Sequence, residues 1–397
     1  MKKLMSLGGN YYQMTAVKTA KKLGYYVIDV DYLPQNPAHR YADEYYNIST
    51  LDKENVLKLA KEKNIDGIIA YASDVSAPTA AWVAEKLGLP TNPYESVNMM
   101  TRKDLFHPFL KKNGFFIPDS ISIESEGDVH DFFSEHHENI MLKPIHSSGS
   151  KGVSHIADES QISDAYIEAQ KYSRGEVLVA EEFIERQGHQ IAGDAFVVDG
   201  EIVFWGVANE HFNEYCNPLV PVGESFPVNL PNSAIVESKK EIQRALSLLK
   251  IRNGAINLDF MFDKSGRIFI IELGPRNGGN LITDAIKLST GVDLAEYTIK
   301  AAMGESLSDL REEKWSKYVS SYIWHSERTG VYQNIEISDE LESRIRKSDM
   351  FVKEGDEIGK YINGGYGLGA ALLEYENKEQ MIDMMDHMND YYKINLR

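Results

Sequence analysis

The sequence has very little cysteine and fewer basic than acidic residues. Its 397 residues include one cysteine, Cys216, so an intrachain disulfide and a cysteine-rich metal site are both excluded. The 60 acidic residues outnumber the 42 basic ones and give a formal net charge of −18. This balance argues against binding to nucleic acid or to an anionic membrane, because both depend on basic patches. A local basic pocket for a phosphate group is still compatible with it.

Long apolar runs are also absent. No window of about 18 apolar residues occurs, so no membrane-spanning helix is expected. The apolar run in the opening MKKLMSLGGN is too short for a signal peptide, so we expect a cytoplasmic location. With 43% apolar and 26% charged residues, the composition is that of a globular protein, and the length allows two or three domains.

Strand and helix patterns alternate over residues 1–93. The expected strands lie at 3–9, 25–31 and 65–71, and the expected helices at 14–24, 53–64 and 77–88. Such alternation predicts an α/β domain with a parallel sheet and helices on both faces. Parallel sheets bind ligands at the C-terminal ends of their strands. Tyr12, just after the first glycine-rich turn, is therefore a candidate substrate contact.

The rest of the chain predicts two further units of mixed α/β and α+β type. Residues 94–306 mix short strands and helices. Within this unit, residues 206–232 read as loop because they contain four prolines. Residues 307–397 predict a small α+β domain, with a linker-like helix over SDELESRIRKS.

Two acidic residues stand out in the segments GAINLDFMFD (254–263) and RIFIIELG (267–274). The intervening turn, DKSG, predicts a β-hairpin. Pairing of the two strands would place Asp259 and Glu272 on one face, where two carboxylates are costly unless a cation lies between them. Oxygen ligands of this kind suit Mg²⁺. The alternative is that each acid meets a basic neighbour or solvent.

A lysine and a loop of small residues follow the apolar strand in NIMLKPIHSSGSKGV. Lys143 ends the strand, and the loop is dense in backbone N–H donors that can cradle phosphate. The candidate phosphate contacts are Ser148, Gly149, Ser150 and Gly152. The loop is not a P-loop, because GxxxxGK[ST] is absent.

The segment EVLVAEEFI (176–184) places an acidic pair, Glu181 and Glu182, inside an apolar run. Its backbone, flanked by Phe183 and Ile184, is suited to hydrogen bonding with a flat heterocycle such as adenine. An ordinary edge strand is the alternative interpretation.

Taken together, residues 97–280 resemble the ATP-grasp superfamily, in the branch with biotin carboxylase, carbamoyl-phosphate synthetase and the purine-pathway carboxylate ligases. The preceding 93 residues are similar to the domain found ahead of such modules, and residues 307–397 to the C-terminal domain of the carboxylase-like members. The resemblance implies that ATP and Mg²⁺ are the cofactors and that residues 115–180, roughly, form a mobile lid. It assigns Lys103, Lys143 and the 147–152 loop to the phosphates, the hinge at Glu181–Ile184 to adenine, and Asp259 with Glu272 to the metal.

Arg276 completes the resemblance as the catalytic cation, facing the transferred γ-phosphate and the attacking carboxylate, with Gly278 and Gly279 letting backbone approach the substrate. Two positions depart from the family pattern. Gly274 stands where the family often has an asparagine that helps to hold a second metal, so the metal count stays open, with Asn280 as a substitute ligand. Gln190 stands where the family has a ribose-binding glutamate.

The resemblance implies an ADP-forming ligase that joins a small carboxylate, such as an amino acid, to an amine through an acyl phosphate. In the loop at 208–227, His211 and Glu224 are candidates to contact the amine or act as a base, with solvated loop residues as the alternative. A bicarbonate-activating carboxylase and a non-catalytic nucleotide-binding protein are competing hypotheses. A homodimer is expected at the level of the family.

Overall fold

The N-terminal domain contains a four-stranded parallel sheet in the order β3-β2-β1-β4. The computed structural model describes residues 1–136, 139–145, 149–173, 175, 177–312 and 314–397. The strands are β1 (Lys3–Leu7), β2 (Tyr26–Val30), β3 (Glu44–Tyr46) and β4 (Gly67–Ile69). The predicted parallel sheet is confirmed; the short strand β3 was not predicted.

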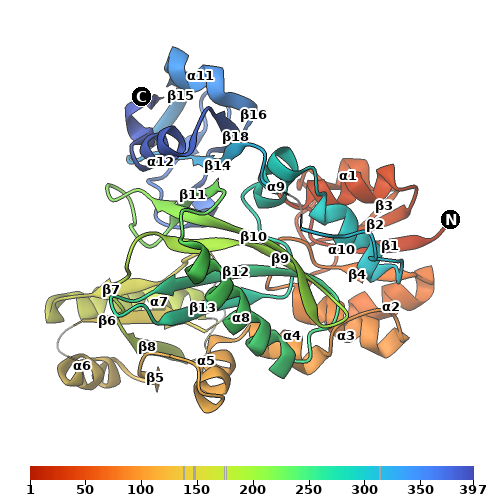
Figure 1. Cartoon of the computed structure of the whole chain (residues 1–397), viewed down its shortest axis with the longest axis horizontal. Coiled ribbons are helices and arrows are strands. Elements are labelled where there is room, and N and C mark those ends of the chain that lie inside the picture. The colour runs from red at the N-terminus through yellow and green to blue at the C-terminus, as the bar shows by residue number, and fades with distance from the viewer. Residues whose placement is uncertain (137–138, 146–148, 174, 176, 313) are drawn as a thin grey trace.

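Helices cover both faces of this sheet, as predicted. The helices α2 (Lys53–Lys63) and α3 (Ala77–Leu87) share one apolar core with it. The opposite face packs against α1 (Met14–Lys22) and against α10 (Leu294–Ala302), which comes from a distant part of the chain. Figure 1 shows α10 beside this domain, so the first domain's core is completed by a later segment.

The central layer is an eight-stranded sheet in the order β13-β12-β9-β10-β11-β14-β18-β16, with every neighbouring pair antiparallel. Its strands are β9 (Gln190–Val198), β10 (Glu201–Phe212), β11 (Pro221–Phe226), β12 (Gly254–Phe262), β13 (Ile268–Gly274), β14 (Tyr318–Trp324), β16 (Ile345–Met350) and β18 (Gly369–Tyr375). The predicted β12–β13 hairpin is confirmed, with Asp259 directly opposite Glu272.

The prediction of a loop at 206–232 was wrong, because this segment holds the second half of β10 and all of β11. Polar residues interrupt the apolar pattern of these strands, so the sequence indicated a loop. In the structure these polar residues are buried and form hydrogen bonds with one another. The Asn209 amide donates to Ser225 Oγ at 3.0 Å, and Ser321 Oγ donates to Glu224. A strand of this kind satisfies its polar groups across the sheet, and no local pattern shows that.

A smaller antiparallel sheet, in the order β5-β8-β6-β7, lies at one end of the molecule (Figure 1) and forms the region predicted as the lid, which is called the lid below. Its strands are β5 (Ser120–Ile123), β6 (Ile140–Pro144), β7 (Ser154–Ile156) and β8 (Leu178–Glu182). The helices α6 (Glu126–Glu135) and α7 (Ile162–Ser173), the second preceded by a 3₁₀ turn at Glu159–Gln161, share its core.

Further helices connect the sheets. They are α4 (Tyr94–Met100), α5 (Lys103–Lys112), α8 (Asn232–Leu248) and α9 (Ile282–Thr290). Both α5 and α8 bury apolar side chains, such as Phe106 and Ile242, against the central sheet. This packing fixes α5, and with it Lys103 at the start of the helix, relative to β13.

The C-terminal segment adds a three-stranded sheet in the order β17-β15-β19. Its elements are β15 (Gly330–Ile337), α11 (Asp339–Arg344), β17 (Glu357–Ile358), α12 (Lys378–Asp386) and β19 (Tyr392–Leu396), with 3₁₀ turns at Gly364–Tyr366 and Met388–Asp390. A further such turn, His39–Tyr41, lies in the N-terminal domain. No helix among the described residues is long and apolar enough to cross a membrane.

The helix expected over SDELESRIRKS is half as long as predicted. It ends at Arg344, and Ile345 begins β16, which pairs with β18. From Ile345 onward the side chains alternate between half-buried and exposed, the pattern of a strand rather than a helix.

Candidate functional site

A cavity of about 1040 Å³ lies where the central sheet, the lid and the C-terminal segment meet. Its wall contains most of the residues predicted from the sequence: Tyr12, Lys103, Lys143, Gly149, Ser150, Glu181, Glu182, Phe183, Ile184, Gln190, Glu224, Asp259, Glu272, Arg276 and Gly279. The fold thus brings together short segments that are widely separated in the sequence.

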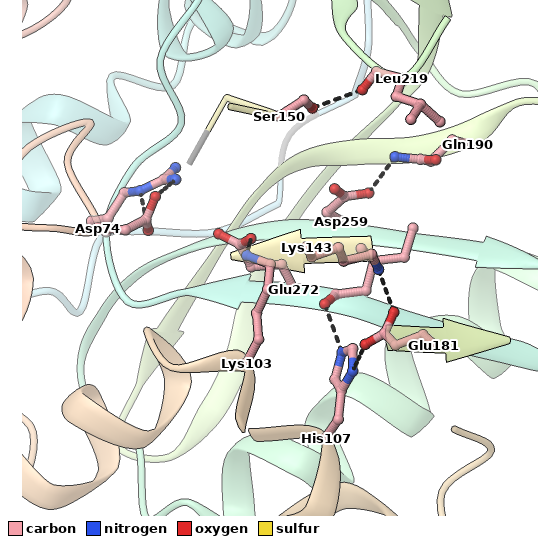
Figure 2. A network of polar contacts seen from close by, with 12 residues as sticks. Asp74, Lys103, His107, Lys143, Ser150, Glu181, Gln190, Leu219, Asp259 and Glu272 are labelled. Carbon is pink, nitrogen blue, oxygen red and sulfur yellow. Dashed lines mark hydrogen bonds and ion pairs between the residues drawn. The ribbon is translucent and has the colours of Figure 1, made fainter. Parts of the chain in front are cut away.

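Two lysines enter the cavity from different elements, each paired with a carboxylate (Figure 2). Lys103 Nζ donates to Glu272 Oε2 at 3.1 Å, and Lys143 Nζ at the end of β6 donates to Glu181 Oε2. Glu181 is 1% exposed. Burial alone would raise its pKa, but the charges of Lys143 and His107 hold that pKa well below its usual range. Both lysine side chains are therefore held by carboxylates at the wall of the cavity.

His107 was missed by the sequence reading, although it belongs to this network (Figure 2). Its Nδ1 lies 2.7 Å from Glu181 Oε1 and its Nε2 lies 3.0 Å from the Ile271 carbonyl oxygen. Both partners are oxygen atoms that can accept a hydrogen bond, so the buried ring is held at both nitrogens. His107 sits one turn after Lys103 on α5 and thereby links the two lysine positions.

Carboxylates from β10, β12 and β13 gather at the cavity wall, next to the Lys103–Glu272 pair. Burial, and next the charge of Glu272, raise the pKa of Asp259 to about 7. Glu210 is 4% exposed, and burial together with Asp259 raises its pKa well above the usual range. The Gln190 amide bridges the two, donating to Glu210 at 2.7 Å and to Asp259 at 2.8 Å. Such a set of oxygen donors fits a divalent cation, which would relieve the repulsion.

Arg276 pairs with a residue from the N-terminal domain, and not with Glu272. Its Nε donates to Asp74 Oδ1 at 2.8 Å, and its Nη2 donates to Asp74 Oδ2. Gly274 makes this possible, because a Cβ at that position would lie 2.8 Å from Asp74 Oδ1 and 3.2 Å from Arg276 Cζ. The room that the family's asparagine side chain would need is thus filled by the Asp74–Arg276 pair.

The described part of the small-residue loop, from Gly149 to Gly152, lies beside the cavity. Ser150 Oγ donates to the Leu219 carbonyl at 2.7 Å (Figure 2), and Gly364 N donates to the Gly149 carbonyl at 3.1 Å. Gly152 packs beneath the loop, where a Cβ would lie 2.9 Å from the Tyr172 ring. Ser148 lies outside the described residues. The lid therefore contacts both the β10–β11 connection and the C-terminal segment.

An apolar compartment adjoins the hinge residues Glu182, Phe183 and Ile184. The rings of Phe183 and His155 stack with centroids 4.0 Å apart. Further apolar side chains line the same cavity: Met141, Met261, Phe269 and Ile271. This combination of a flat slot and hinge backbone suits a heterocyclic base.

The other end of the cavity is formed by the N-terminal domain and the C-terminal segment. Glu224 is buried there, and burial raises its pKa to about 7. Asn280 Nδ2 donates to Glu224 Oε1 at 3.4 Å. Gly279 faces Tyr12, whose ring lies 4.0 Å from where a Cβ would stand. Tyr361 closes this end from the C-terminal segment.

Two predicted substrate contacts lie away from the cavity wall. His211 points to the other face of β10, where Nδ1 lies 2.7 Å from Asp386 Oδ1. Its neighbours Glu210 and Phe212 line the cavity instead, since side chains alternate along a strand. Gly278 donates its N–H to Asp194 Oδ1 at 2.8 Å, is packed against Ile282 and Asn257, and does not itself line the cavity.

Comparison with known proteins also indicates the ATP-grasp family that the sequence motifs resemble. Residues 136–284 match the family model described as an ATP-grasp domain. Over 313 residues the chain is 23% identical to the carbamoyl phosphate synthase large chain, C-terminal section, of Aquifex aeolicus, covering 78% of this chain and 57% of that one. It is 26% identical to a formate-dependent phosphoribosylglycinamide formyltransferase of Sulfurovum over 69% of this chain and 70% of that one.

Solved structures share the fold over the full length. The crystal structure of an L-amino acid ligase from Bacillus licheniformis superposes with a TM-score of 0.85 at 21% identity, covering 100% of this chain and 99% of that one. A phosphoribosylglycinamide synthetase from Anaerococcus prevotii gives 0.76 at 22% identity, with both chains covered completely. By contrast, the chain spans 57% of the Aquifex relative and 29% of an arginine-specific large chain from Bacillus subtilis.

Proposed function

Because this chain belongs to the ATP-grasp superfamily, we propose that it is an ADP-forming ligase that joins a small carboxylate to an amine. The observation that carries the proposal is the content of the 1040 Å³ cavity. Cations from Lys103, Lys143 and Arg276 face the same space as a cluster of buried carboxylates and an apolar slot beside the hinge. The cations can bind the phosphates of a nucleoside triphosphate, the carboxylates can bind its metal ion, and the apolar slot can hold its base.

The proposed reaction has two steps. A carboxylate oxygen of the first substrate attacks the γ-phosphorus of ATP, the bond to the β-phosphate oxygen breaks, and an acyl phosphate and ADP result. The amine nitrogen of the second substrate then attacks the acyl carbon, and inorganic phosphate leaves with the former carboxylate oxygen. Mg²⁺ held by Asp259 and Glu272 would shield the phosphate charge. The sum is an amide, ADP and phosphate.

The chain's own residues supply positioning and charge. Glu272 orients Lys103 toward the cavity, and Glu181 orients Lys143. Both lysines therefore need little rearrangement to bind the anionic oxygens of a phosphate group. Arg276, fixed by Asp74, presents a planar fork that suits the carboxylate and the phosphoryl group. The docked lid excludes water, which would otherwise hydrolyse an acyl phosphate.

The buried acids at the far end favour an amine as acceptor. Glu224 and Glu210 line that end, and their buried carboxyl oxygens can accept hydrogen bonds from an amine. A carboxyl group with a pKa of about 7, as Glu224 has, is suited to taking the proton that the amine must lose. Similarity to a structure named as an L-amino acid ligase supports amino acids as the first substrates to test.

The test is ADP release in the presence of Mg²⁺ across amino acids and small carboxylates, offered singly and in pairs. The proposal predicts release that requires one particular pair, with a product whose mass equals the pair minus water. Release that bicarbonate alone stimulates would replace it with a carboxylase. Binding of ATP without release for any acceptor would favour a non-catalytic nucleotide-binding protein.

A further inference from the structure

Three side chains that can ligate a metal ion meet behind the cavity wall. His189 directly precedes β9, His211 lies on β10, and Asp386 is the last residue of α12. His211 Nδ1 lies 2.7 Å from Asp386 Oδ1, and His189 Nε2 lies 3.2 Å from the same oxygen. All three ligand atoms lie within 4.8 Å of one another, and none of the three residues lines the cavity.

We propose that His189, His211 and Asp386 bind a divalent transition-metal ion, with zinc as the ion that suits them best. Two imidazole nitrogens and one carboxylate oxygen are typical zinc ligands, whereas Mg²⁺ prefers oxygen alone. Tetrahedral ligands of zinc stand about 3.4 Å apart, as follows from bonds of about 2.1 Å. The two histidine–aspartate separations, 2.7 and 3.2 Å, are shorter than that value, so the ion enters after a small outward movement of the side chains.

The two outer ligands have the freedom to make that movement. The side chains of His189 and Asp386 are 29% and 40% exposed, so they reach solvent and leave a fourth position for water. His211, at 1%, is the fixed point of the site. A site of this kind, with three protein ligands and one open position, is reached from solvent without opening the core.

A second group of contacts orients the fixed ligand. His211 Nε2 lies 2.8 Å from Ser225 Oγ, which also accepts from the Asn209 amide at 3.0 Å. A serine hydroxyl can donate to or accept from an imidazole nitrogen. It can therefore donate its O–H to Nε2 now and accept the Nε2 N–H when Nδ1 binds a metal. Such a partner on the far ring nitrogen is usual for metal-binding histidines.

The site would connect the C-terminal segment to the strands of the cavity. Asp386 comes from α12, whereas His189 and His211 flank Gln190 and Glu210, which bridge toward Asp259 on the other face. An ion on the rear face of β9 and β10 would fasten α12 to the sheet and stiffen the strands that carry the cavity's carboxylates. Its role is therefore structural, apart from the Mg²⁺ site.

The experiment measures zinc binding by competition with a chromophoric zinc chelator, using metal-stripped full-length protein without nucleotide. Excess Mg²⁺ is present so that the oxygen-rich site in the cavity is filled. The wild-type chain is expected to take up one zinc ion per chain and to unfold at a higher temperature with zinc than without, because an ion that binds only the folded state stabilises it. His189→Gln and Asp386→Asn should each weaken zinc affinity at least about tenfold.

The control is His130→Gln, which removes an exposed histidine that lies 3.0 Å from Glu159 Oε1 on the lid. This variant should bind zinc as tightly as the wild type. Equal zinc binding by wild type, His189→Gln and Asp386→Asn would overturn the proposal, as would the absence of zinc uptake by the wild type. These readouts do not involve ADP release, so they are independent of the proposed ligase activity.

Discussion

At the residue scale, Arg276 is the side chain on which the proposed chemistry most depends. It comes from the loop after β13, yet Asp74 of the N-terminal domain fixes its orientation through two parallel hydrogen bonds. Arginine is suited to this position because its fork can bond a carboxylate and still present an N–H edge to a phosphoryl group.

We predict that Arg276→Ala keeps ATP affinity within about twofold but lowers turnover by at least about 10²-fold, the usual cost of one lost electrostatic donor. Calorimetric ATP binding and ADP release measure the two quantities separately. Asp74→Asn is the matched variant: it keeps the arginine, loses only the ion pair, and should lose less activity. Normal turnover in Arg276→Ala would remove the residue from the mechanism.

The two adjacent glycines after Arg276 differ in what a side chain would meet. A Cβ at Gly278 would lie 2.7 Å from Ile282 Cδ1 and 2.8 Å from Asn257 Nδ2, whereas at Gly279 the nearest atoms, in the Tyr12 ring, are 4.0 Å away. Gly278→Ala should therefore lower the free energy of unfolding by about 1–3 kcal/mol. Gly279→Ala should change it by less than about 0.5 kcal/mol. Urea unfolding of both variants decides this, and equal stabilities would contradict it.

Individual site residues were predictable only where they belong to a local pattern. Lys143, Asp259 and Glu272 end or interrupt apolar strands, and that interruption is visible in the sequence. Asp74 and His107 meet their partners over separations of 202 and 74 residues, so no spacing identifies them. That Asp74 lies beside Arg276, and His107 beside Glu181, is visible only in the folded chain.

At the scale of elements, hydrogen bonds at Gly149 and Ser150 join the lid to other parts of the molecule. Ser150 Oγ bonds the Leu219 carbonyl, and the Gly149 carbonyl accepts from Gly364 N. Since one hydrogen bond contributes about 1 kcal/mol, Ser150→Ala should raise the KM for ATP about fivefold without changing kcat. Steady-state ADP release provides both constants.

The control for the lid is Ser134→Ala, because the Ser134 hydroxyl bonds the His130 carbonyl within its own helix, α6. It should leave both constants unchanged. If Ser150→Ala also has an unchanged KM, the bond to Leu219 does not hold the lid over the nucleotide.

Elements were predictable where the sequence itself marks them, as in the β12–β13 hairpin, in which two apolar segments are separated by a short turn. The strand β11, with sequence PVGESF, was not, because its polar residues are satisfied by partners far along the chain. Glu224 accepts from Ser321, a residue 97 positions later on β14. Local composition therefore indicated a loop, while the long-range pairing made a core strand.

At the scale of the whole molecule, the C-terminal segment is part of the central sheet and closes the cavity through Tyr361, Gly364 and Gly365. Its junction with the sheet contains His325, which is 2% exposed. His325 Nδ1 donates to the Ile323 carbonyl at 2.8 Å and Nε2 accepts from Asn213 Nδ2 at 2.8 Å, so the ring is neutral. Burial lowers its pKa from 6.5 to about 4.

This histidine predicts a pH dependence of stability. The unfolded chain takes up a proton near pH 6.5 and the folded chain does not until about pH 4, so acidification favours unfolding over that window. The group's contribution to the free energy of unfolding should fall by about 0.7 kcal/mol between pH 7 and pH 6. His325→Gln should lose that part of the slope in urea unfolding at the two pH values. Parallel slopes for variant and wild type would contradict the prediction.

The central claim, that the cavity forms an acyl phosphate on the way to an amide, is tested most directly by oxygen transfer. Once the required substrate pair is known, the carboxylate partner is supplied with ¹⁸O in its carboxyl group, and the released nucleotide and phosphate are analysed by mass. The account predicts ADP together with inorganic phosphate that carries one ¹⁸O atom. Release of AMP and pyrophosphate, or of phosphate without label, would contradict it.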